Sequence, residues 1–117
     1  MYRIIFYRKA NGEAPILDYI RELKSSESKD SRIKRNKIAQ YMKMLRVYGT
    51  QAGERYLKHL DGEIWELRPI RDRILFAAIV GRRFLLLHYF MKRTGKTPSR
   101  EIEQAKRELT DYLEREG

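Results

Sequence analysis

The stretch from residue 64 to 93 constrains the fold most strongly, because it holds three extended apolar runs that are separated only by short turns. Trp65 and Leu67 alternate with Glu66 and Arg68 in the first run, the period of two that is typical of a strand with one buried face. The next two runs are RDRILFAAIV and FLLLHYFMKR, and the GRR between them favours antiparallel pairing. The stretch therefore predicts a three-stranded meander in which Arg68 faces solvent.

The residues before this stretch predict a strand and two helices. Residues 2–9 are rich in β-branched and aromatic side chains, so they predict a strand. Apolar residues at helical spacing, with a proline in the first turn, predict a short amphipathic helix over residues 15–24. A second helix begins near Asp30, where an acid or serine can cap it, and ends at Gly49. The segment 50–62 is predicted to be a connection with room for one helical turn.

A last helix completes the predicted fold. Thr97 and Pro98 give a helix start, and apolar residues at helical spacing continue to Leu113. The length of 117 residues fits a single domain. The expected class is therefore α+β, one domain over residues 1–117, in the order β-α-α-β-β-β-α.

The charge of the chain indicates which kinds of partner it attracts. The formal net charge of +10 predicts attraction to polyanions such as nucleic acid. The chain has no cysteine, which suits a reducing cytoplasm, and no apolar run long enough for a signal peptide or a membrane span, so we expect a soluble cytoplasmic protein without membrane contact. From residue 68 to 100 the only acid is Asp72. The cations there are Arg68, Arg71, Arg73, Arg82, Arg83, Lys92, Arg93, Lys96 and Arg100.

Residues 60–113 carry a resemblance to a known family. Its specific parts are the WELR block, the arginine five residues further on, the LLHYFMKR run, and KTPSREIEQAKRE at the start of the last helix. Together they resemble the HigB-like, phage Gp49-like branch of the RelE/ParE toxin superfamily. The resemblance implies a RelE-like fold, with an antiparallel-rich sheet packed on two N-terminal helices and a C-terminal helix.

The same resemblance implies a function. Members of this branch are toxins of type II toxin-antitoxin systems, usually endoribonucleases that cleave mRNA on the ribosome and so inhibit translation. The implied partner is a helix-turn-helix, HigA-like antitoxin encoded next door, and the implied contact with operator DNA occurs only through the toxin-antitoxin complex. We place the antitoxin contact on the basic second helix, where charge reversal at Lys34, Arg35 and Lys37 is expected to weaken it.

The candidate catalytic residues are cations. In the expected reaction the 2′-hydroxyl of RNA attacks the adjacent phosphate, and arginine suits the stabilisation of the charge that develops there. By resemblance, Arg73 and Arg93 occupy the places of the phosphate-binding arginines, and Arg68 belongs to the WELR block. A lysine accepts a proton near neutral pH only when neighbouring cations disfavour its charged form, and Lys92 lies beside Arg93. We expect these cations to form a phosphate cradle on one face of the sheet, with the other face packed on the helices.

A second set of residues is expected to bind RNA around these four. His88 is an alternative proton acceptor, although it shares a predicted strand face with Phe84, Leu86 and Phe90, where a structural role is the common one. Tyr89 either stacks on a base or packs in the core. The full set of expected RNA-binding residues is Lys96, Tyr89, His88, Arg71, Lys34, Arg35 and Lys37.

No metal or other cofactor is expected. Metal-dependent nucleases hold their ions with clustered carboxylates, and the sheet region has only Glu63, Glu66 and Asp72. Two alternatives from other classes stay open at this stage: a ParE-like inhibitor of DNA gyrase, and a non-catalytic basic module that binds nucleic acid. The presence of Arg68, Arg73, Lys92 and Arg93 on one sheet favours RNA cleavage over gyrase inhibition, and the family resemblance favours catalysis over plain binding.

Overall fold

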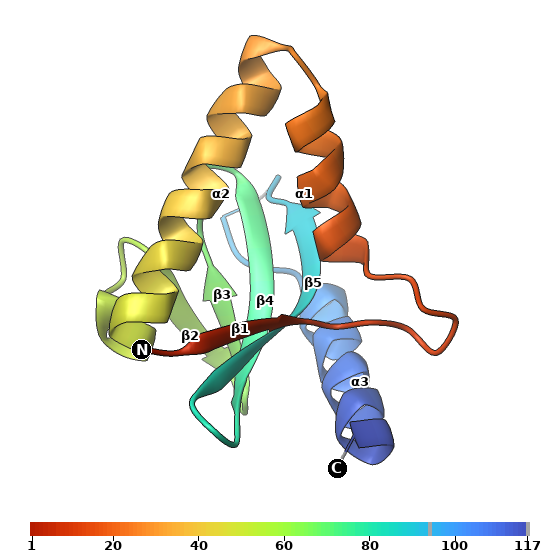
Figure 1. Cartoon of the computed structure of the whole chain (residues 1–117). Coiled ribbons are helices and arrows are strands. Elements are labelled where there is room, and N and C mark those ends of the chain that lie inside the picture. Colours follow the sequence, from red (N-terminus) through yellow and green to blue (C-terminus); the bar gives the residue numbers. More distant parts are fainter. Residues whose placement is uncertain (94, 117) are drawn as a thin grey trace.

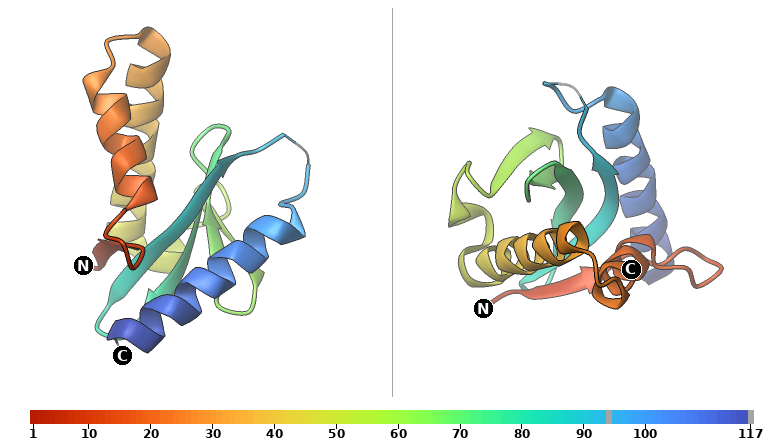
Figure 2. Two further views of the ribbon diagram at one scale, coloured as in Figure 1. Left: turned by 90° about the vertical axis from the view of Figure 1, so that its right-hand side faces the viewer. Right: turned by 90° about the horizontal axis from the view of Figure 1, so that it is seen from above.

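The chain folds into one five-stranded sheet with helices on both of its faces (Figures 1 and 2). The computed structural model describes residues 1–93 and 95–116. The elements follow one another as β1 (Arg3–Phe6), α1 (Pro15–Ser25), α2 (Lys29–Tyr48), the 3-10 helix η1 (Gly49–Ala52), β2 (Leu57–Asp61), β3 (Ile64–Leu67), β4 (Asp72–Ile79), β5 (Arg83–Met91) and α3 (Ser99–Glu116).

The sheet is mixed, with the strand order β1-β5-β4-β3-β2. Strands β2 to β5 form an antiparallel meander, and β1 joins its edge parallel to β5. The expected α+β class is confirmed, as is the order of two helices, strands and a last helix. Among the described residues, no helix is long and apolar enough to cross a membrane.

The segment 50–62 differs from its prediction as a connection. Residues Leu57–Asp61 form the edge strand β2, which pairs with β3 and places Leu57 opposite Leu67. Leu57 is buried, but Lys58 and His59 are exposed, as an edge strand allows. The strand therefore shows little of the apolar pattern on which the prediction depended.

The sheet is buried on both faces, which corrects the expectation of an open cationic face. The α1–α2 hairpin covers one face, over a core that includes Ile38, Leu45 and Phe76. Helix α3 covers the opposite face and packs Ala105 and Leu109 on the strands. The alternation of Glu66 and Arg68 with apolar residues reflects two buried faces, and Arg68 retains only 28% of its side-chain exposure.

A β-bulge corrects the predicted face of His88. Leu75 lies opposite His88, whereas the next residue of β4, Phe76, lies opposite Leu86, so Leu87 is an extra residue in β5. The insertion reverses the alternation beyond it. His88 consequently contacts Glu101 of α3, while Leu86 packs on the side of α1 and α2.

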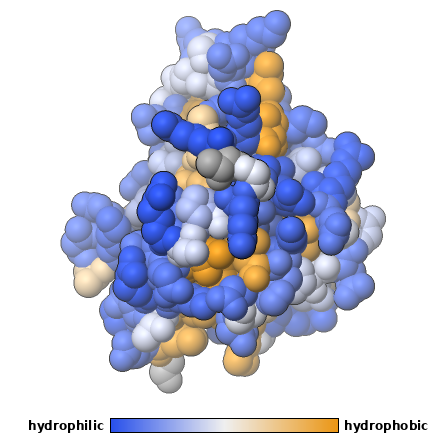
Figure 3. Space-filling model, turned by 180° about the vertical axis from the view of Figure 1, so that it is seen from behind, coloured by the Kyte–Doolittle hydropathy of each residue, from blue (hydrophilic) through white to orange (hydrophobic). Residues whose placement is uncertain are grey.

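Local signals fix the helical hairpin that later defines a groove. The Ser28 hydroxyl accepts a hydrogen bond from the backbone N–H of Ser31 and caps α2. Gly49 ends this helix with a φ of 60°, and its N–H bonds to the Leu45 carbonyl. Figure 1 shows that the α1–α2 hairpin projects beyond the end of the sheet at which β5 terminates. Figure 3 shows the opposite side of the molecule, which is largely hydrophilic with small apolar patches.

Candidate functional site

A cationic cleft lies where β4 begins and β5 ends. Antiparallel pairing places Asp72 opposite Met91, and the Lys92 N–H extends the ladder by bonding to the Arg71 carbonyl at 2.8 Å. The cleft has a volume of about 540 Å³. The residues that line it are Arg71, Arg73, Met91, Lys92 and Arg93. The cations thus gather at one end of the hairpin and not on a face of the sheet.

Arg73 is the most firmly held of these cations, because it is only 8% exposed. Its Nη1 donates to the carbonyl oxygens of Ile70 at 2.8 Å and Asp72 at 3.0 Å. Ile70 adopts a φ of 54°, a conformation that costs a β-branched residue about 1–3 kcal/mol and orients its carbonyl in the turn before β4. Burial lowers the pKa of the Arg73 guanidinium, yet an arginine keeps its proton at any physiological pH. The cleft therefore contains a fixed positive charge.

Glu66 holds two of the arginines from the side of α3. This carboxylate is 2% exposed, and its Oε2 lies 3.5 Å from Arg68 Nε and 3.8 Å from Arg73 Nε. Its Oε1 accepts a hydrogen bond from the buried Thr97 hydroxyl. Thr97 thus ties the connection before α3 to β3. Burying a charge requires such compensation, so Glu66 depends on its partners as much as they depend on it.

Sequence reasoning missed this role of Glu66, because a period of two placed the side chain in solvent. The available signal was the spacing of one acid between arginines in a strand whose neighbours are apolar. Arg68 pairs with Glu66 and donates to the Glu54 carbonyl at 3.3 Å. Arg68 is not one of the described residues that line the cleft. It supports the buried carboxylate from outside the cleft.

Asp72 organises the other side of the same strand end. This buried carboxylate accepts from the Tyr19 hydroxyl, which lies 3.3 Å from each of its oxygens, and its Oδ1 lies 4.0 Å from Lys34 Nζ. Burial and the adjacent Asp72 raise the pKa of Tyr19 to about 12. Tyr19 belongs to α1 and Lys34 to α2, so both helices are fixed to the start of β4. Glu66, on the α3 side of the sheet, and Asp72, on the side of α1 and α2, together hold the cleft in place.

The arrangement suits an anion with several oxygens. Arginine forks bind phosphate oxygens in pairs, and four cations around one cleft provide a strong local field. Within residues 1–93 and 95–116, no group of three or more His, Cys, Asp or Glu side chains is placed to hold a metal ion. The cleft can therefore bind and polarise a phosphodiester through side-chain cations.

Comparison with known protein families agrees with this reading at a coarse level. A model of the family described as phage derived protein Gp49-like (DUF891) matches residues 18–110. The chain belongs to this Gp49-like family. A search of curated proteins found no match. The Gp49-like family is toxin-like, and membership is compatible with the toxin of a toxin-antitoxin pair. The matched residues include the whole cationic cleft.

The structure brings together three of the four predicted catalytic residues: Arg73, Lys92 and Arg93. Arg71, which was predicted to bind RNA, lines the same cleft. His88 is directed to α3 by the bulge, and its Nε2 lies 2.7 Å from Glu101 Oε1. Among the described residues, His88 does not line the cleft.

Two further residues predicted to bind RNA, Tyr89 and Lys96, are not among the described residues that line the cleft. Tyr89 stacks on Tyr19 with ring centroids 4.4 Å apart and an interplanar angle of 10°, the packing role that was the alternative to base stacking. Burial raises the pKa of Tyr89, and the Glu22 and Asp72 carboxylates add to the effect. Lys96 is exposed and immediately precedes Thr97.

The three cations predicted as one basic face of α2 point to different neighbours. Lys34 pairs with Asp72, beside the cleft, whereas Arg35 lines a groove between α1 and α2. Consecutive helix residues are about 100° apart around the axis, so these two cannot share a direction. Lys37, three residues after Lys34, is half-buried.

Proposed function

We propose that this Gp49-like protein is the toxin of a type II toxin-antitoxin system and acts as an endoribonuclease on mRNA. The observation that carries the proposal is the cleft of Arg71, Arg73, Lys92 and Arg93, in which Arg73 is buried and held by two carbonyls. A preorganised charge stabilises a transition state better than a mobile one, because it needs no reorganisation during the reaction. Family membership supports the toxin class, and the cleft supports the chemistry.

The proposed reaction is a transfer of phosphorus within the RNA. The 2′-oxygen attacks the adjacent phosphorus and loses its proton, the bond from phosphorus to the 5′-oxygen breaks, and the 5′-oxygen takes up a proton. The products are a 2′,3′-cyclic phosphate and a 5′-hydroxyl. Arg73 stabilises the charge that develops on the non-bridging oxygens, and Arg71 and Arg93 orient the strand.

We assign the transfer of the 2′-hydroxyl proton to Lys92. Lys92 lines the cleft, whereas His88 is engaged with Glu101 on the α3 side. Arginine is unsuited to the task because it does not release its proton. Among the described residues that line the cleft there is no carboxylate to accept the proton instead.

The experiment that tests this function is a map of new 5′ ends on cellular mRNA after induction of the protein. We expect cuts within coding regions, in phase with the reading frame if cleavage occurs on the ribosome, and a loss of protein synthesis before any loss of DNA replication. Early arrest of replication with intact mRNA would instead support the gyrase inhibitor. Intact mRNA with both processes unaffected would support the non-catalytic binding module.

The proposed reaction also predicts that cleavage continues without divalent metal. The charge on phosphorus is stabilised by arginine, so excess EDTA should leave the cleavage of a model RNA unchanged. The assay has to omit ribosomes, which need magnesium themselves. A strict requirement for added divalent ion would contradict the proposed mechanism.

The proposal includes a partner, because a cell that makes such an enzyme has to keep it silent. We propose an antitoxin of the helix-turn-helix, HigA-like class, encoded in the adjacent gene, which represses the shared promoter together with the toxin. The net charge of +10 favours an acidic partner and fast, salt-sensitive association.

A further inference from the structure

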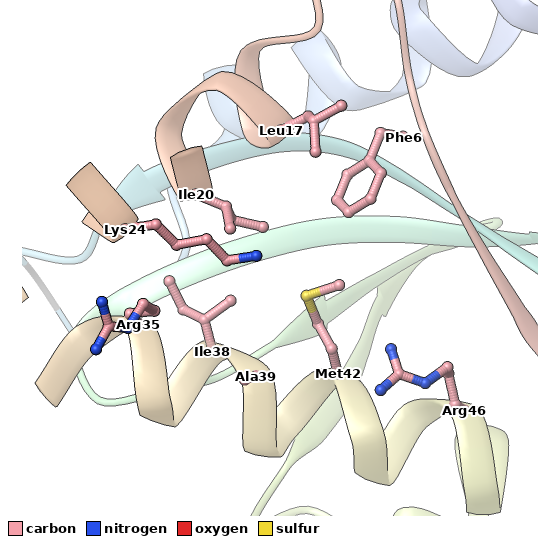
Figure 4. A pocket seen from close by; sticks show the side chains of 9 residues that line it. All are labelled: Phe6, Leu17, Ile20, Lys24, Arg35, Ile38, Ala39, Met42 and Arg46. Atoms are coloured by element: carbon pink, nitrogen blue, oxygen red, sulfur yellow. The ribbon is translucent and has the colours of Figure 1, made fainter. Parts of the chain in front are cut away.

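A groove between α1 and α2 is the strongest candidate for a second functional surface. It has a volume of about 250 Å³. Its floor is apolar and comes from β1, α1 and α2. The apolar residues are Phe6, Leu17, Ile20, Ile38, Ala39 and Met42. Figure 4 shows the larger of these side chains directed toward one another from the two helices and the first strand.

Three cations surround this apolar floor. Lys24 extends along the groove from α1, and Arg35 and Arg46 stand toward its two ends on α2 (Figure 4). Across residues 1–93 and 95–116, no carboxylate lies within ion-pair distance of any of the three. Lys34, on the same helix, differs because its ammonium group pairs with Asp72. The groove therefore presents unpaired positive charge around apolar surface.

The dimensions of the groove suit side chains of a peptide. Arg35 and Arg46 are eleven residues apart, which on an α-helix corresponds to about 16 Å, or three turns. The volume falls below the roughly 300–1,000 Å³ of pockets that enclose small ligands. Apolar residues at positions i, i+4, i+7 and i+11 of a partner helix span the same three turns and insert side by side into such a groove.

The charge pattern selects the occupant. A second copy of this chain carries the same net charge of +10 and would meet like charge at the rim. An RNA backbone has the right charge but no use for an apolar floor. A helix with an apolar stripe flanked by Asp and Glu satisfies both requirements. We propose that the α1–α2 groove binds an acidic amphipathic helix of the antitoxin, an inference that rests on the proposed function and names where that partner docks.

The groove is separate from the cationic cleft. Among the described residues, the groove and the cationic cleft share no lining residue, and α2 directs Arg35 to the groove and Lys34 toward Asp72. A helix in the groove leaves the cleft unfilled.

The first test changes the groove floor. Ala39 is an exposed residue that lines the groove, and A39E adds both bulk and negative charge there while glutamate keeps the helix. The matched control is Q40E, at the next position, which is exposed and does not line the groove. Each variant is combined with Arg73→Ala so that it can be purified, and its affinity for the product of the adjacent gene is measured by calorimetry.

The second test reverses the rim charge. The double variant K24E/R35E is compared with R32E/K43E, which makes the same change of charge at two exposed cations of α2 outside the groove. We expect A39E and K24E/R35E to weaken binding by about tenfold or more, and the two controls by far less. Without Arg73→Ala, A39E should still arrest growth and should no longer be rescued by the adjacent gene.

The outcomes separate this inference from the proposed function. Equal affinity of A39E, K24E/R35E and their controls for the adjacent gene product overturns the inference. Failure of that product to bind the parent chain overturns it too, while new 5′ ends on mRNA that are absent with Arg73→Ala still uphold the enzyme. Circular dichroism spectra that match those of the parent chain are required of every variant, so that a misfolded protein is not counted as a lost contact.

Discussion

The β4–β5 hairpin carries arginines at both of its ends, and the two ends are built differently. At the open end, Arg73 is buried, bonded to two carbonyls and faced by Glu66. At the turn end, Arg82 lies over the ring of Tyr2 at 4.4 Å from its centroid, and Arg83 donates to the Val80 carbonyl at 2.7 Å. In the described part of the chain, neither arginine of the turn has an ion pair.

This difference indicates what separates a site from a solvated charge. Both ends carry cations, but Arg73 at the open end is buried and bonded to two carbonyls, whereas Arg82 at the turn end is exposed. Two buried acids hold the open end. Glu66 faces Arg73 on one face of the sheet, and Asp72 binds Tyr19 of α1 on the other face. The turn arginines are more accessible to solvent: Arg82 is exposed and Arg83 is half-buried.

The largest expected effect comes from removing the buried cation. Arg73→Ala should abolish growth inhibition, because the loss of one donor to a developing charge raises the barrier by about 2.7–4 kcal/mol. The matched change at the turn end, Arg82→Ala, should leave growth inhibition intact. Growth is measured after induction at equal soluble expression, and unchanged toxicity of Arg73→Ala would remove Arg73 from the mechanism.

A smaller effect is expected from the acid behind it. Glu66→Gln keeps the shape and an acceptor for Thr97 but removes the charge that faces Arg68 and Arg73. We expect a loss of about 1.5–3 kcal/mol in the free energy of unfolding, the usual size for a contact with a charged group, together with slower cleavage of mRNA. Urea unfolding and a ribosome-programmed cleavage assay measure the two.

The control for this variant is Glu63→Gln, which removes an exposed acid just before β3. It should change neither quantity. If Glu66→Gln is as stable and as active as Glu63→Gln, the open end does not depend on its buried carboxylate, and the comparison with the turn end loses its physical basis.

The sequence predicted the helices and the central strands because their signals are local. Proline at the start of α1, a serine cap on α2 and glycine at its end act within a few residues, and the meander follows from apolar runs. The edge strand β2 was missed because Leu57 is its one buried residue, so it has no alternating apolar pattern. What makes it a strand is its pairing with β3, which the local sequence does not show.

The candidate site was predicted in its residues but not in its geometry. Arg73 and Arg93 were identified by resemblance and Lys92 by its neighbouring cation. Their place at a strand end follows from the burial of both sheet faces by helices far apart in sequence. The extra residue at Leu87 leaves no mark in the sequence, so the direction of His88 was wrong. Glu66 was predicted to face solvent because the alternation of apolar and charged residues along a strand does not show whether its second face is covered by water or by another core.

The smallest expected effect concerns Tyr19, which links α1 to the open end through Asp72. Tyr19→Phe should lower the free energy of unfolding near neutral pH by about 0.5–1.5 kcal/mol, the usual value of one hydrogen bond. The pKa of Tyr19 is raised from 10.0 to about 12 in the folded chain, so its contribution is complete below pH 10 and is lost as the pH rises toward 12. Stability measured from pH 9 to 12 should therefore fall less steeply in Tyr19→Phe than in the parent chain. Tyr48→Phe, at an exposed tyrosine of α2, should reproduce the parent profile. Identical slopes for all three proteins would show that the bond to Asp72 does not hold the open end together.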